Sequence, residues 1–230
     1  PDGVSEKLVY GDIVRIAWPS FVELILTQLA SMVDLMMVGQ LGAWALTAVG
    51  LTTQPKFMMM TMIMAMNVGA TAMVARYKGA GDPEKANNIL RQALVLTFVI
   101  SAVSSIIGYV FSEPLVAFMG AQDQQSLEGG TIYLQIQFLG FVFMALTSTV
   151  TACLRGVGDS RTAMVYNLVA NGVNVVGNYV LIYGKFGFPE LGVAGASLAT
   201  VIGQCVAFVL AFRAIMGNKS YLHLSFRDSF

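Results

Sequence analysis

Hydrophobic residues along the chain form six long runs, separated by shorter stretches that are polar or rich in glycine. A helix needs about 20 mostly apolar residues to cross the hydrocarbon core of a membrane. The backbone in a membrane must satisfy its own hydrogen bonds, and the alternation typical of a barrel is absent, so the runs predict helices. The predicted spans are 13–38, 45–75, 89–111, 132–154, 163–183 and 193–216. The second is long enough to be tilted or bent.

Composition supports an all-α integral membrane fold. The 230 residues are 56% hydrophobic and 11% charged, whereas soluble domains carry roughly 25% charge. The net charge of zero gives no reason to expect nucleic-acid binding. Cys153 and Cys205 lie in apolar runs and are interpreted as small buried residues, and His223 as a solvated residue of the tail. Because no motif of a catalytic site appears, neither an enzyme nor a cofactor is expected.

Lysine and arginine positions orient the spans, because these residues concentrate in cytoplasmic loops. With the N-terminus inside, 11 of the 13 basic residues fall on the inner side. They are Lys7, Arg15, Arg76, Lys78, Lys85, Arg91, Arg155, Arg161, Arg213, Lys219 and Arg227. Lys185 falls outside, and Lys56 lies near the outer face. The split predicts a multi-pass membrane protein with a cytoplasmic segment 1–12, a six-helix lobe 13–217 and a cytoplasmic tail 218–230. The expected location is the plasma (inner) membrane.

Two predicted cytoplasmic turns resemble each other. Residues 79–83 read Gly-Ala-Gly-Asp-Pro, and residues 156–160 read Gly-Val-Gly-Asp-Ser. Glycine permits a tight turn, the aspartate can cap the next helix and Pro83 suits a first helical position, so turn chemistry alone explains the likeness. A second echo, on the predicted outer side, consists of Asp34, Gly39 and Gly42 against Asn178, Gly184 and Gly187. Together the echoes suggest two related three-helix units, as is common in transporters.

Three predicted spans carry polar residues at spacings of three and four, which place them on one helical face. The stripes are Ser20, Glu23, Thr27, Ser31 and Asp34; Asn167, Asn171, Asn174 and Asn178; and Ser197, Thr200 and Gln204. They are expected to face each other or a water-filled cavity. For serine and threonine alone, hydrogen bonds between helices, worth roughly 0.6–2 kcal/mol each, are the favoured explanation. Four stacked asparagines and two carboxylates on one face favour a functional role.

The two carboxylates, Asp34 and Glu23, are the strongest functional candidates. A charged side chain in mid-membrane costs about 2.5–3.5 kcal/mol and commonly marks an ion or proton pathway. A carboxyl group removed from water favours its protonated form, which suits proton exchange. A carboxylate with Asn and Thr oxygens also suits a hard cation such as Na⁺, so both ions stay open. Asp34 ranks above Glu23, which lies nearer the predicted cytoplasmic end, where its side chain can snorkel.

Backbone features add further candidates. Pro19 removes a backbone hydrogen bond and bends the first span, and this bend is either static or a hinge coupled to Asp34. Gly192, Ala196 and Thr200 follow the small-xxx-small spacing that marks close helix contact.

Methionines cluster between Met58 and Met66. They either fill packing gaps or offer a flexible, polarizable surface to varied apolar ligands. Together with the polar stripes they define a set of residues expected to line a cavity. This set is Ser31, Thr27, Asn167, Asn171, Gln204 and Met64.

Four stretches carry a family resemblance. Residues 34–50, Asp-Leu-Met-Met-Val-Gly-Gln-Leu-Gly-Ala-Trp-Ala-Leu-Thr-Ala-Val-Gly, resemble the first loop of the MATE family, the multidrug and toxic compound extrusion transporters. Residues 75–82, Ala-Arg-Tyr-Lys-Gly-Ala-Gly-Asp, are similar to the segment after the family's second helix. Residues 154–161 and 191–200 resemble later signatures. The resemblance covers the whole chain, with the four stretches in the family's order.

The resemblance implies one lobe of a larger machine. MATE transporters have twelve helices in two six-helix lobes, so this chain resembles the N-terminal lobe, and residues 221–230 resemble the start of the inter-lobe linker. It implies cation-coupled antiport, in which Na⁺ or H⁺ enters as an amphipathic, often cationic drug leaves. The implied partners are a C-terminal lobe or a second copy of the chain, together with membrane lipid.

The resemblance also implies a cation site. The family's helix-one proline and aspartate and its helix-five polar residues fall on Pro19, Asp34, Asn174 and Asn178, and the nearest helix-six hydroxyl is that of Thr200. Some members carry a second aspartate where this chain has Asn178, which leaves fewer negative charges here for Na⁺. Glu23 has no matching family role.

Two other functions fit the sequence less well. A lipid-linked oligosaccharide flippase of the same superfamily is disfavoured because the spans hold almost no Lys or Arg. A non-transporting membrane scaffold subunit is disfavoured by the polar stripes. Transport driven by ATP hydrolysis in this chain is also disfavoured, because the phosphate-binding loop motif is absent.

Overall fold

The structure is a computed structural model that describes residues 6–184 and 192–216. Every regular element in these ranges is a helix. The helices are α1 (Glu6–Gly39), α2 (Ala43–Leu51), α3 (Thr53–Gly79), α4 (Pro83–Val110), α5 (Ser112–Phe118), α6 (Gln124–Leu139), α7 (Phe141–Gly156), α8 (Ser160–Tyr183) and α9 (Val193–Met216). Five stretches are long and apolar enough to cross a membrane, and α6 with α7 makes a sixth as a bent pair. The predicted all-α membrane fold is confirmed.

Several predicted boundaries differ from the observed helices. α1 begins at Glu6, so the segment 1–12 is in part helical. The span 45–75 is interrupted at Thr52, whose hydroxyl donates to the carbonyl oxygen of Val49 at 2.7 Å. The short helix α5 was not predicted. The tail 218–230 lies outside the described residues.

The span 132–154 is not the single helix that was predicted. It begins earlier, at Gln124, and α6 and α7 meet at an angle of 51° at Gly140. A Cβ at Gly140 would lie 2.8 Å from Val201 Cγ1 of α9. Glycine lets α9 approach the bend this closely, and its low helix propensity makes the interruption less costly.

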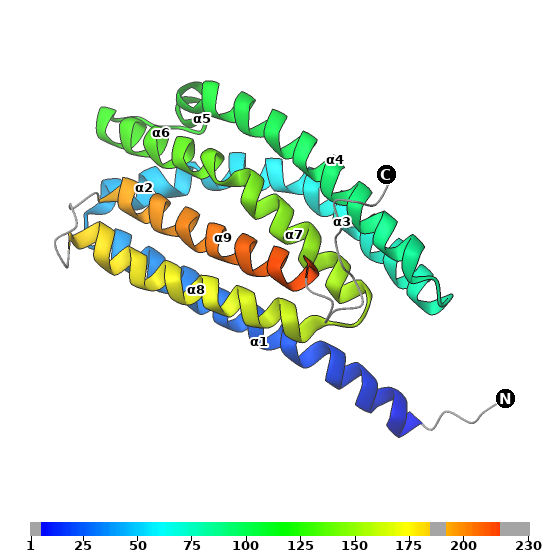
Figure 1. The fold of residues 1–230 in the computed structure, drawn as a ribbon. Coiled ribbons are helices and arrows are strands. Elements are labelled where there is room, and N and C mark those ends of the chain that lie inside the picture. The colour runs from blue at the N-terminus through cyan, green and yellow to red at the C-terminus, as the bar shows by residue number, and fades with distance from the viewer. Residues whose placement is uncertain (1–5, 185–191, 217–230) are drawn as a thin grey trace.

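The helices surround a core that joins both halves of the chain. Figure 1 shows α1 and α8 side by side, with α9 next to α8, while α3 and α4 lie on the far side of α7. The largest buried cluster includes Val74, Leu90, Val150 and Ile215. Large apolar residues on α1 stay exposed, among them Phe21, so α1 offers this surface to lipid or to another membrane-embedded protein surface.

The two turns predicted to be alike have the same local structure. Gly81 and Gly158 adopt positive φ angles of 71° and 85°. Asp82 accepts from the backbone N–H of Lys85, and Asp159 accepts from that of Thr162, as expected for helix caps. Both turns lie at one end of the bundle, where Lys78 beside the first turn donates to the carbonyl oxygen of Val157 in the second. This end, which also carries Arg161, is called the basic end below. In the second echo, Gly187 lies outside the described residues.

Glycines bring α8 and α9 into close contact. A Cβ at Gly195 would lie 2.6 Å from the carbonyl oxygen of Leu181, and one at Gly203 would lie 2.8 Å from that of Ala170. The predicted stripe of Gly192, Ala196 and Thr200 therefore identified the right helix. Gly203, three residues beyond Thr200, continues its face, whereas Gly195 lies on a neighbouring one.

Replacing Gly195 with alanine should destabilise the fold by roughly 1–3 kcal/mol, because the backbone that the added methyl meets cannot rotate away. The matched control is Gly172→Ala in α8, where nothing lies within 4 Å of an added Cβ. That variant should keep or slightly raise stability, since alanine favours helix. Thermal unfolding of the purified protein in detergent measures both, and equal melting temperatures would contradict the close contact.

Candidate functional site

Polar side chains join α1 to α8 at three levels along the two helices. The pairs are Glu23–Asn167 at 2.9 Å, Thr27–Asn171 at 3.0 Å, and Asp34–Asn178. In each pair the asparagine Nδ2 donates to an oxygen of α1. Every pair is separated by 144 residues, so the two helices run in the same direction with a constant register. The expectation that the polar stripes face each other is confirmed for these two helices.

The pair of Asp34 and Asn178 combines a carboxylate with a fully buried amide. Asp34 is half-buried, while the side chain of Asn178 is inaccessible to solvent. Asn178 Oδ1 has no hydrogen-bond partner among the described residues. A carboxylate beside an unpartnered amide oxygen provides the oxygen donors that a hard monovalent cation takes, and the carboxylate can also take up a proton.

A second connection links α8 to α9. Thr200 Oγ1 donates to Asn174 Oδ1 at 3.3 Å, and Gln204 Nε2 contacts Met144 Sδ of α7 at 3.1 Å. Asn174 is one turn from Asn178 on α8. The predicted cation-site residues therefore occur as two neighbouring pairs, Asp34 with Asn178 and Asn174 with Thr200.

Glu23 does not snorkel toward water, as its position near the helix end had suggested. It is buried, with 8% of its surface exposed. Arg155 Nη2 donates to Glu23 Oε2 at 2.7 Å, and Asn167 donates to the other carboxylate oxygen. Glu23 thus connects α1 to both α7 and α8.

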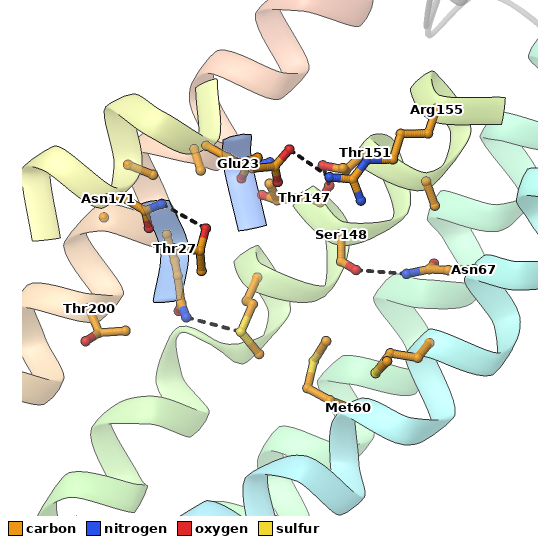
Figure 2. Close-up of a pocket in the computed structure, with 18 of the residues that line it drawn as sticks. Glu23, Thr27, Met60, Asn67, Thr147, Ser148, Thr151, Arg155, Asn171 and Thr200 are labelled. Carbon is orange, nitrogen blue, oxygen red and sulfur yellow. Dashed lines mark hydrogen bonds and ion pairs between the residues drawn. The ribbon is translucent and has the colours of Figure 1, made fainter. Parts of the chain in front are cut away.

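The three hydrogen-bonded pairs between α1 and α8 are called the polar ladder below. A cavity of about 920 Å³ lies between this polar ladder and the helices α3 and α7. Figure 2 shows Glu23, Thr27 and Asn171 on one side of it and Met60 and Asn67 on the other. The structure places all six predicted lining residues in its wall: Ser31, Thr27, Asn167, Asn171, Gln204 and Met64. Glu23, Asn174 and Thr200 also line it, whereas Asp34 and Asn178 lie outside its wall.

The far wall is held by a polar network that sequence reasoning missed. Asn67 Nδ2 donates to Ser148 Oγ at 2.8 Å, and Thr149 Oγ1 donates to Asn67 Oδ1 at 2.9 Å. Thr149 also hydrogen-bonds Thr97 of α4, at 2.8 Å between the two hydroxyl oxygens. The network fixes α3, α4 and α7 to one another behind the cavity.

Three missed lining residues carried a signal in the sequence. Thr147, Thr151 and Arg155 line the cavity and are spaced four apart, so they form a stripe like the three that were recognised. Arg155 was instead counted as a loop cation.

Lys56 also lines the cavity. Lys56 and Arg155 both belong to the cavity wall, so basic residues are not scarce here and their scarcity in the spans does not count against a flippase. Arg155 is paired with Glu23.

Pro19 lies buried inside α1, away from the large cavity. It lines a smaller cavity of about 410 Å³ at the basic end, between α1 and the turn that joins α7 to α8. The helix continues through Pro19 to Gly39.

The chemistry of the large cavity suits binding. No group of three or more His, Cys, Asp or Glu residues that could hold a metal occurs in the part of the chain that the structure describes. The wall combines amides, hydroxyls and methionines with one carboxylate, Glu23, and two cations, Lys56 and Arg155. Cavities of this size, with apolar walls and few oriented polar groups, typically hold small organic ligands.

Comparison with known proteins identifies relatives of the chain. A family model described as MatE matches residues 19–180. The multidrug resistance protein PmpM of Pseudomonas aeruginosa is 30% identical over 224 residues, which are 96% of this chain and 46% of PmpM. The probable multidrug resistance protein NorM of Thermotoga maritima is 28% identical over 195 residues, 85% of this chain and 42% of NorM.

A solved structure also resembles the chain. A MOP superfamily transporter from Pyrococcus furiosus matches with a TM-score of 0.86 at 26% identity, covering 94% of this chain and 47% of its own. The chain spans about half the length of the relatives it matches.

Proposed function

Because the chain belongs to the MatE family, we propose that it is one lobe of a cation-coupled multidrug efflux antiporter of the plasma membrane. The names of its relatives support transport and multidrug efflux. The observation that carries the proposal is the cavity of about 920 Å³ beside a ladder of buried polar pairs. With the basic end inside, both ends of the chain lie in the cytoplasm.

The drug and the coupling ion occupy neighbouring positions in this proposal. The drug takes the cavity, where methionines adapt to apolar rings and amides and hydroxyls orient polar groups. The ion, Na⁺ or H⁺, takes Asp34 and Asn178, with Asn174 and Thr200 one turn away. Thr27 of α1 and Asn171 of α8 line the cavity and are hydrogen-bonded to each other, so the cavity wall includes the same two helices that carry Asp34 and Asn178. A change in the charge of Asp34 therefore acts on the helix pair that forms one side of the drug site.

The proposal needs a second lobe. The chain covers less than half of PmpM, and α1 leaves a broad apolar face exposed. A C-terminal lobe or a second copy of this chain covers the cavity from the other side, with membrane lipid around both. No catalytic role is proposed for any residue.

The cavity assignment predicts that filling it removes drug binding. Ala72 of α3 lines the cavity, so Ala72→Trp should weaken binding of the fluorescent cationic dye rhodamine 6G by about tenfold or more, a loss of about 1.4 kcal/mol. Met73→Trp is the control, because Met73 is the next residue on α3 and is exposed outside the cavity wall. Fluorescence polarisation of the purified protein measures both.

If the Ala72→Trp variant folded normally and kept its affinity for the dye, the drug would not bind in this cavity. A flippase makes the opposite prediction. If the chain were part of a flippase, a lipid-linked sugar would bind in the cavity and the dye would not. The Ala72→Trp change would then weaken binding of the lipid-linked sugar.

A further inference from the structure

The smaller cavity at the basic end joins three parts of the chain. Its volume is about 410 Å³. Its wall includes Arg15, Trp18 and Pro19 of α1, Lys78 of α3, Asp159 of the α7–α8 turn and Arg161 of α8. Three cationic side chains from three different helices therefore face one small space.

Two described acidic groups, Asp159 and Asp12, lie near these cations. Asp159 is engaged as a helix cap, and its two carboxylate oxygens accept from Thr162. Asp12 pairs with Arg15 at 3.2 Å, but both side chains are largely exposed, and such a pair is weak in water. Lys78 donates to the carbonyl oxygen of Val157, which holds its ammonium group against the turn. Among the described residues, the cavity wall therefore contains three cations and one carboxylate.

An aromatic and apolar margin adjoins these cations. The guanidinium carbon of Arg161 lies 5.7 Å from the ring centroid of Trp18, a cation–π geometry. Ile16 of α1 and Val165, one turn beyond Arg161 on α8, are about half exposed. Tryptophan at the end of a span is typical of the membrane–water interface. The margin therefore offers an apolar surface for acyl chains directly beside a basic space.

We propose that this cavity binds the phosphate headgroup of an anionic phospholipid. Arg15 and Arg161 contact the phosphate, Trp18 lies at the glycerol level and the acyl chains follow Val165, which lies one turn further from the basic end than Arg161. Basic pockets between membrane helices bind anionic headgroups in this way. A lipid is favoured over free phosphate because the apolar margin would gain nothing from a small anion.

The bound headgroup links α1 at Pro19 to the ends of α3 and α8. It therefore stabilises the arrangement of these three helices at the basic end. Lipid binding is measured on the purified chain without any transport assay. A failure to bind lipid would therefore leave the proposed efflux function untouched.

Trp18 is a built-in reporter, because the chain holds two tryptophans and Trp44→Phe leaves only Trp18. The purified, delipidated chain in neutral detergent is titrated with brominated phosphatidylglycerol, which quenches tryptophan on contact. Saturable quenching is expected, and brominated phosphatidylcholine should need a much higher concentration. Native mass spectrometry of the unsubstituted chain, counting bound phosphatidylglycerol, checks the result without the Trp44 change.

Removing two cations tests the site directly. Arg15→Gln with Arg161→Gln should weaken phosphatidylglycerol binding by about 30-fold, the effect of two basic contacts. The matched control, Lys85→Gln with Arg213→Gln, removes the same charge from exposed residues outside the cavity and should leave binding unchanged.

Three results would overturn the proposal. One is equal quenching by the two brominated lipids, and another is full binding by the double arginine variant. The third is displacement of phosphatidylglycerol by an excess of sodium phosphate, which would reassign the cavity to a small free anion.

Discussion

Replacing Asp34 with asparagine should abolish cation-driven dye efflux by the assembled transporter, with the amount of protein in the membrane unchanged. Asparagine has nearly the shape of aspartate, and its Oδ1 can still accept from Asn178 Nδ2, as Asp34 does. Only the charge and the exchangeable proton are lost. Since Asp34 is the carboxylate proposed to bind the ion, the change removes the coupling and not the fold.

The assay follows dye leaving cells or vesicles after a Na⁺ or pH gradient is imposed. Running the two gradients separately also identifies the coupling ion. Glu113→Gln is the control, because Glu113 is an exposed acid in the first turn of α5, far along the chain from the polar ladder. That variant should transport normally. If Asp34→Asn transported like the unsubstituted protein, the ion would bind elsewhere.

The facing of α1 and α8 could be predicted because it depends on local spacing. Polar residues repeat every three or four positions in otherwise apolar spans, and in a membrane such a stripe must turn toward other polar groups. Spacing alone did not give the register. That Asp34 meets Asn178 while Glu23 meets Asn167 follows from the constant offset of 144 residues between the two helices.

The features that sequence reasoning missed depend on contacts between distant helices. The bend at Gly140 accompanies the approach of Val201 in α9, and nothing near Gly140 in the sequence reports that neighbour. Arg155 looked like a loop cation because it ends an apolar run, and its partner Glu23 is 132 residues away. The fold class followed from hydrophobic length, whereas the shape of the cavity required the packed helices.

Replacing Arg155 with glutamine should lower the stability of the lobe by about 3 kcal/mol. Removing one member of a buried ion pair leaves the other charge uncompensated, at a cost of about 3–5 kcal/mol. The lower figure is expected because 36% of the Arg155 side chain is exposed, although only 10% of the Glu23 side chain is. Thermal or denaturant unfolding of the purified protein measures the loss.

The order of the variants tests the cause. Glu23→Gln should cost less than Arg155→Gln, because glutamine is neutral and can still accept from Asn167, while Arg155 keeps partial access to water. The double variant Glu23→Gln/Arg155→Gln should then be more stable than Arg155→Gln alone, since it no longer buries an unpaired carboxylate. If the double variant were instead the least stable of the three, the two losses would simply add. Glu23 would then be held by its amide contact with α8, and the ion pair that joins α1 to α7 across the cavity would contribute little to stability.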